Sequence, residues 1–215
     1  MEAKRNMTSY KQGLKDKILE TAMLAFAAEG IKAVRMDDIA QSMGISKRTL
    51  YELYENKEVL LYEGVKKFKA QREKELEEMA GQSRNVMDVV LQAYRIKVLE
   101  FRKVNASFYS EIGKYPSVKQ LLEQDQKVRH QRTLAFLRRG VAEGYFRQDV
   151  DYILAIRLFD AMGDYVMTNE LYKQHSLEHI LNNLIFVSLR GFCTQRGVEV
   201  LDTFMQEDHF TIDNG

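Results

Sequence analysis

Apolar residues recur every three to four positions along almost the whole chain, and this spacing constrains the fold more than any other feature of the sequence. Only one proline, Pro116, occurs in 215 residues, so long helices meet few breaks. Valine, isoleucine and threonine never gather in the alternating runs that are typical of strands. The sequence therefore predicts an all-α protein.

Glycine, polar clusters and the proline divide this pattern into separate helices. The first is expected over residues 10–29 and ends at Gly30, which tolerates the left-handed backbone that closes many helices. Two short helices follow, and Asn56 precedes a long one. The remaining expected ranges are 36–43, 46–53, 57–79, 86–104, 106–113, 117–143, 151–173 and 176–195, with one more turn over 198–205.

Residues 36–51 have the order of side chains that is typical of a helix-turn-helix. Ala40 is small at the place where the two helices would cross at close range. Gly44 follows four residues later, where the first helix must turn through a left-handed conformation. Ser46 is a good N-cap for the second helix. The turn glycine, the small residue at the crossing and the N-cap together favour a DNA-binding motif.

Three hydrogen-bond donors, Lys47, Arg48 and Thr49, come directly after this cap. They lie at the end of the helix that reaches base edges when such a helix enters the major groove. The formal net charge of +1 neither supports nor excludes DNA binding, because phosphate contact depends on where the charges lie. The alternative is a helical hairpin with a solvated charged face, which the turn glycine and the crossing residue disfavour.

Residues 10–62 resemble the DNA-binding domain of the TetR family of repressors. The resemblance rests on the run Gly30-x8-Ile39-Ala-x3-Gly44-Ile-Ser-x2-Thr49-Leu-Tyr51-x2-Tyr54-x-Asn-Lys57-Glu-x-Leu. It implies a recognition helix that contributes Ser46, Lys47, Arg48 and Thr49, a phosphate contact from the Tyr51 hydroxyl, and a DNA-backbone contact from Lys57. Independently of the family, Lys57 and the open amides of its helix's first turn would form an anion site.

Three residues depart from the family pattern. Arg35 stands where a capping Thr or Ser is common, so the cap is lost and a phosphate contact is gained. Arg48 replaces a frequent Gly and suits bidentate recognition of guanine. Tyr54 replaces a frequent Phe, and its hydroxyl needs a partner if it is buried. Three basic residues near the N-terminus, Lys4, Arg5 and Lys11, form either a DNA-contacting arm or, more commonly, a solvated tail.

The chain after the helix-turn-helix carries most of the aromatic residues and methionines. Such stripes are more often core than pocket, but polar residues such as Asp160 are interleaved with them, and the family resemblance implies a ligand domain. The candidate residues for binding a small apolar or amphipathic effector are Tyr94, Phe108, His130, Phe159 and Met162. We therefore divide the chain into a helix-turn-helix domain (1–60), joined by a long helix to a larger effector-binding and dimerisation domain (61–215).

The last two long helices carry more apolar surface than one helix pair can bury, among it Leu158, Met162 and Val187. The family resemblance implies that these helices form a four-helix dimer interface. A homodimer also matches a palindromic operator in double-stranded DNA, whose half-sites lie about one helical turn apart. We expect a homodimer.

The function predicted from the sequence is a DNA-binding transcriptional regulator, a repressor released by a small-molecule effector. The alternative is a similar DNA-binding protein without a small ligand, controlled by a protein partner. An enzyme is disfavoured, because no phosphate loop, metal motif or nucleophile–base pair is present. No cofactor or metal is expected: His175 and His179 lack a third ligand, and Cys193 is expected to be buried. Without a signal peptide or an apolar span, we expect a cytoplasmic protein and no membrane partner.

Overall fold

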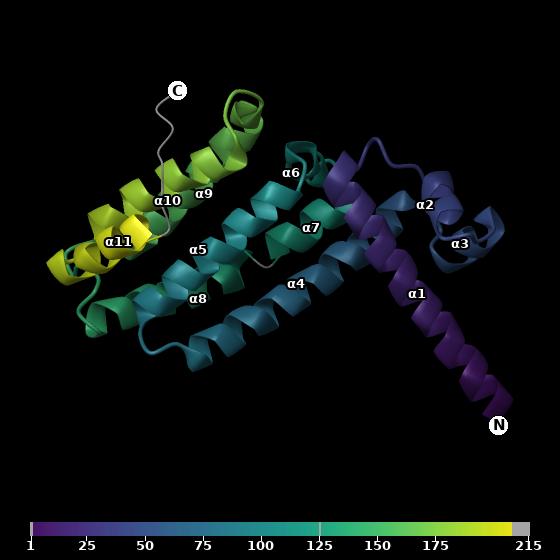
Figure 1. Ribbon diagram of the computed structural model, residues 1–215, viewed down its shortest axis with the longest axis horizontal. Coiled ribbons are helices and arrows are strands. Elements are labelled where there is room, and N and C mark those ends of the chain that lie inside the picture. Colours follow the sequence, from purple (N-terminus) through teal and green to yellow (C-terminus); the bar gives the residue numbers. More distant parts are fainter. Residues whose placement is uncertain (1, 125, 208–215) are drawn as a thin grey trace. The chain divides into compact units, whose positions relative to one another are not determined.

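The computed structural model describes residues 2–124 and 126–207, with side chains from Tyr10 onward (Figure 1). All regular elements of this part of the chain are helices, and the only β-type pairing within it is one isolated bridge between Phe146 and Cys193, which confirms the all-α prediction. The helices are α1 (Glu2–Glu29), α2 (Met36–Ser42), α3 (Lys47–Leu53), α4 (Lys57–Gln82), α5 (Val86–Lys103), α6 (Ala106–Ile112), α7 (Pro116–Gln124), α8 (Gln126–Ala142), α9 (Tyr152–Thr168), the 3₁₀ turn η1 (Leu171–Lys173), α10 (Leu177–Phe192) and α11 (Gln195–Glu207).

The packing of these helices forms two compact units. Unit 1 comprises Met1–Glu73 and Lys103–Gln124, and unit 2 comprises Lys74–Arg102 and Asp125–Gly215. Helices α6 and α7 thus pack with the N-terminal helices. The predicted division at residue 60 concerns function rather than packing, and it stays a prediction.

The core of unit 1 is built from one stripe of α1 together with the helix-turn-helix, the start of α4 and part of α7. Ile18, Phe26, Leu50 and Val118 are fully buried in it. Gly30 ends α1 as predicted: its φ is +92°, and its N–H donates to the Phe26 carbonyl at 3.0 Å. This core fixes the position of α3 against α1.

The core of unit 2 gathers the apolar faces of α5, α8, α9, α10 and α11. Met87, Phe146 and Leu201 are each at most 2% exposed. The backbone of Gly140 in α8 lies so close to the Phe146 ring that a Cβ there would stand 2.0 Å from Cδ2. Only glycine allows this contact.

Several helix boundaries differ from those expected. Helix α1 begins at Glu2 rather than Tyr10, because no helix-breaking residue precedes Tyr10. The range 117–143 is not one helix, since α7 ends at Gln124 and α8 begins at Gln126. Helix α9 ends at Thr168, and Glu170 turns left-handed with a φ of 52° before η1. The expected turn over 198–205 is the full helix α11, whose Leu201 and Phe204 are buried. Residues 208–215 of the predicted tail lie outside the described residues.

Candidate functional site

Helices α2 and α3 form the predicted helix-turn-helix. Ala40 and Ile39 are each 1% exposed, so the two helices cross at close range on small and branched side chains. Gly44 has a φ of +65° in the turn, where other residues would be strained. The turn is closed by a hydrogen bond of 3.0 Å from the Ile45 N–H to the Ala40 carbonyl. The local chemistry of the sequence is sufficient to explain this geometry.

The two helices of the motif are capped differently. The Ser46 Oγ accepts from the Thr49 N–H at 3.0 Å, as predicted, and lies 2.8 Å from the Thr49 hydroxyl. At the start of α2 the Arg35 guanidinium has no acceptor to offer, so the side-chain cap is absent, as predicted. Asp38 supplies part of the function of the missing cap, since the Asp38 carboxylate accepts from the Arg35 N–H at 2.8 Å. Because only the backbone N–H of Arg35 takes part in this bond, its side chain extends into solvent at the start of α2.

The predicted DNA-contacting cations lie on the surface of α3. The Lys47 side chain is 67% exposed and lies 2.5 Å from Asp37. The Arg48 side chain is 88% exposed and lies 2.8 Å from Glu52. Tyr51 is exposed as well. The carboxylate partners of both cations were not anticipated from the sequence.

Tyr54 closes α3 against α1. It is buried, and its hydroxyl donates to the Lys15 carbonyl at 3.2 Å, which is the partner the sequence required. Burial raises the pKa of Tyr54 to about 12, and the carboxylates of Glu63 and Asp16 add to the shift. The hydroxyl is therefore an internal structural donor.

Lys57 has a structural role that the sequence did not reveal. Its Nζ donates to the carbonyls of Ile31 at 2.7 Å and Val34 at 2.8 Å, with a longer contact of 3.5 Å to Lys32. Burial lowers the pKa of this ammonium, while Glu111 and Asp38 oppose the change. The three N–H groups are used within the loop between α1 and α2, so a phosphate contact from Lys57 requires a change of partners and stays a prediction.

Replacing Lys57 with methionine is expected to lower the free energy of unfolding of the protein by about 1–3 kcal/mol, because charge-assisted hydrogen bonds to the loop are lost. Denaturant unfolding followed by circular dichroism measures the change. Lys66→Met is the matched control, since Lys66 is an exposed residue of the same helix. Equal stability of the two variants would show that Lys57 does not hold the loop.

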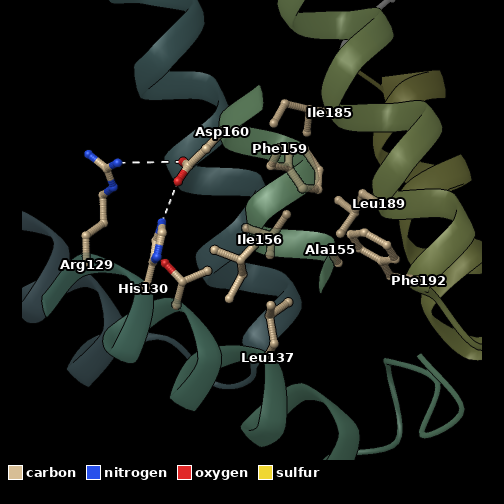
Figure 2. A pocket seen from close by; sticks show the side chains of 12 residues that line it. Arg129, His130, Leu137, Ala155, Ile156, Phe159, Asp160, Ile185, Leu189 and Phe192 are labelled. Atoms are coloured by element: carbon tan, nitrogen blue, oxygen red, sulfur yellow. Dashed lines mark hydrogen bonds and ion pairs between the residues drawn. The ribbon is translucent and has the colours of Figure 1, made fainter. Parts of the chain in front are cut away.

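Unit 2 contains a pocket of about 320 Å³ between helices α5, α8, α9 and α10 (Figure 2). Two of the five predicted ligand residues, His130 and Phe159, line it. The other three lie elsewhere: Tyr94 is buried with its hydroxyl on Asn182, Phe108 packs in unit 1, and Met162 is 36% exposed on α9. The walls are mostly apolar and include Leu137, Ala155, Ile156, Ile185, Leu189 and Phe192.

The polar end of the pocket centres on Asp160. Its Oδ2 accepts from the Gln126 amide at 3.0 Å. The same oxygen lies 2.5 Å from His130 Nε2, while Arg129 stands 3.6 Å from Oδ1 (Figure 2). Burial alone would raise the pKa of this carboxyl, but the hydrogen bonds and the Arg129 charge outweigh it and lower the pKa. Asp160 is therefore held ionised, with its charge largely compensated.

The helix-turn-helix is also the part of the chain that matches a known protein family. A family model described as bacterial regulatory proteins of the tetR family matches residues 18–63, which include α2 and α3. The HTH-type transcriptional repressor KstR2 of Mycolicibacterium smegmatis is 26% identical over 155 residues, covering 66% of this chain and 72% of that protein. Residues 18–63 are therefore a DNA-binding domain of the TetR family of transcriptional regulators.

Solved structures extend the likeness to the fold of the chain beyond this domain. A putative transcriptional regulator from Saccharomonospora viridis, in complex with choline, superposes with a TM-score of 0.69 at 19% identity, covering 86% of this chain and all of that one. The ketosteroid transcriptional regulator KstR2 of Mycobacterium tuberculosis superposes with a TM-score of 0.57 at 19% identity, covering 84% and 95%. The chain therefore shares the fold of these regulators.

Helices α9 and α10 present large apolar side chains to solvent. Leu158 is 55% exposed, Tyr165 61% and Val187 71%. Ile153 and Leu154 extend the surface along α9. Two other leucines of α10, Leu177 and Leu189, are instead buried within unit 2.

The structure also gives the surroundings of the cysteine and the two histidines considered in the sequence analysis. Cys193 is buried, as predicted, and burial raises the pKa of its thiol to about 11. The rings of His175 and His179 stack at 5.4 Å, and within the described part of the chain no group of three ligands could hold a metal ion. No described helix has the length and apolarity to cross a bilayer. The side chains of Lys4 and Arg5 lie outside the described residues.

Proposed function

We propose that this TetR-family regulator is a repressor that binds a palindromic operator in the cytoplasm as a homodimer and leaves it when a small molecule binds. The observation that carries the proposal is the exposed start of α3, where Lys47 and Arg48 stand directly after the Ser46 cap. Helices of this kind place their first residues against base edges in the major groove. The proposed DNA contacts are those of Arg35, Ser46, Lys47, Arg48, Thr49, Tyr51 and Lys57.

The homodimer is supported by the apolar surface of α9 and α10. Leu154, Leu158 and Tyr165 follow one another at helical spacing on α9, and each is more than half exposed. A contiguous exposed apolar surface of this kind marks a protein interface. A two-fold dimer would present two copies of α3 to two half-sites.

The effector is supported by the pocket of unit 2. Its volume of about 320 Å³ falls within the range of small-molecule sites, and its walls are mainly aliphatic and aromatic. Because Arg129, His130 and Gln126 already compensate Asp160, the pocket favours a neutral apolar molecule with one polar group over a simple cation. The described relatives include a ketosteroid regulator and a choline complex, so both chemistries belong in the test.

Release of operator DNA on addition of small molecules tests this proposal. The compounds are a panel of neutral apolar molecules that includes ketosteroids, with choline as the cationic probe. At a concentration a hundredfold above its Kd, an effector is expected to stabilise the protein by about 2.7 kcal/mol. Ala155→Phe fills part of the pocket, and we expect it to abolish release and stabilisation while leaving operator binding intact. Release of this variant at the same effector concentration would place the binding site elsewhere.

A further inference from the structure

Both cations at the start of α3 are paired with carboxylates. Lys47 Nζ lies 2.5 Å from Asp37 Oδ2, and Arg48 Nε lies 2.8 Å from Glu52 Oε1. A carboxylate on a surface that approaches DNA is repelled by the phosphates, so it opposes sequence-independent binding. Glu52 lies on the recognition helix itself, one turn after Arg48.

The Arg48–Glu52 pair contributes little to the stability of the fold. Their side chains are 88% and 61% exposed, and ion pairs at i and i+4 on an exposed helix are weak in water. A requirement for folding therefore does not explain Glu52. A role in DNA recognition accounts for a carboxylate at this position.

The geometry of the pair leaves the outer edge of the guanidinium available. Glu52 accepts the one N–H of Arg48 Nε, and the four N–H groups on the two Nη atoms extend beyond it. A guanine presents O6 and N7 as adjacent acceptors in the major groove, which matches two parallel N–H donors. An arginine fixed through Nε loses less rotamer freedom when it binds a base than a freely rotating one.

We propose that Glu52 determines operator specificity by positioning Arg48. It holds Nε so that the Nη edge meets a guanine, and its charge opposes contacts between Arg48 and phosphates in other sequences. The inference rests on the proposed recognition role of α3. Glu52 thereby lowers the affinity for unrelated DNA and raises the preference for the operator.

The test compares two DNA probes and five variants. The probes are a duplex of about 30 base pairs selected by the wild-type protein from a randomised pool and a scrambled duplex of the same composition. The variants are Glu52→Gln, Glu52→Asp, Arg48→Ala, the double variant Arg48→Ala/Glu52→Gln, and Glu55→Gln. Glu55 is an exposed carboxylate just after α3 and serves as the control for simple loss of charge. Fluorescence anisotropy at several salt concentrations gives the affinities.

We expect Glu52→Gln to bind the scrambled duplex more tightly and to steepen its salt dependence by about one unit of log–log slope per subunit. The ratio of the two affinities falls about tenfold. Glu52→Asp keeps the charge but is too short to hold Nε, so it weakens operator binding without gaining affinity for scrambled DNA. In the Arg48→Ala background, Glu52→Gln leaves the ratio unchanged.

Three results would overturn the inference. They are an unchanged ratio in Glu52→Gln, the same fall in Glu55→Gln, and a fall that persists without Arg48. The last would mean that Glu52 contacts a base itself, as an acceptor for cytosine N4. If the wild-type protein selects no sequence from the pool, the proposed function itself fails. If it selects an operator but Glu52→Gln gives one of the three results above, only the inference about Glu52 fails.

Discussion

Replacing Leu158 with glutamate is expected to convert the dimer into monomers and to lower operator affinity at least a hundredfold. Leu158 is 55% exposed on α9, and in the proposed interface it would pack against the partner. A buried carboxylate without a counter-charge is strongly destabilising, and a two-fold interface contains it twice. A monomer binds one half-site only, so it loses the gain of about 10²–10⁴ in affinity that a second linked site provides.

Sedimentation velocity and anisotropy with the selected duplex measure the two effects. Leu99→Glu is the matched control, because Leu99 is 53% exposed on α5. We expect this control to remain dimeric and to bind the operator normally. A Leu158→Glu protein that stays dimeric would contradict the assignment of α9 to the interface, and a monomer with full affinity would contradict the need for a dimer.

Arg48→Ala is expected to remove the preference for guanine at one position of each half-site, at a cost of about 1–3 kcal/mol. The exposed guanidinium at the start of α3 is the donor group best suited to a base edge. Tyr51→Phe is expected to weaken binding to all sequences about equally, because a phosphate contact carries no sequence information. Arg48→Ala is therefore expected to change the affinity for particular sequences, and Tyr51→Phe the affinity for all of them.

Competition with duplexes that each carry one base substitution separates these patterns. For Arg48→Ala we expect the affinities of the selected duplex and of one particular substitution to become equal. A uniform loss over all duplexes would assign Arg48 to the DNA backbone. No loss at all would remove Arg48 from the interface.

The helix-turn-helix was predictable because its determinants are local. Gly44 needs its left-handed backbone, Ala40 its small side chain and Ser46 its cap, whatever the rest of the chain does. The buried hydroxyl of Tyr54 could be foreseen too, although its partner, the Lys15 carbonyl, could not. Sequence reasoning was sound where a residue's neighbours lie within a few turns.

Contacts between distant segments were not predictable from one sequence. The carbonyls that hold Lys57 belong to the loop 23 to 26 residues earlier, and periodicity does not show which helix faces this loop. The same limit applied to the pocket, since Tyr94, Phe108 and Phe159 are all aromatic residues at helical spacing and the sequence does not distinguish them. Only the packing of unit 2 places Phe159 beside His130 and Asp160.

A hydroxyl-radical footprint on the selected duplex tests the central claim most directly, namely that two copies of α3 bind one operator. We expect two protected patches related by two-fold symmetry and centred about one helical turn, roughly 34 Å, apart. Methylation of one guanine N7 in each half-site would block binding by the wild-type protein but leave the residual binding of Arg48→Ala unchanged. A single protected patch, or interference confined to the minor groove, would contradict the account.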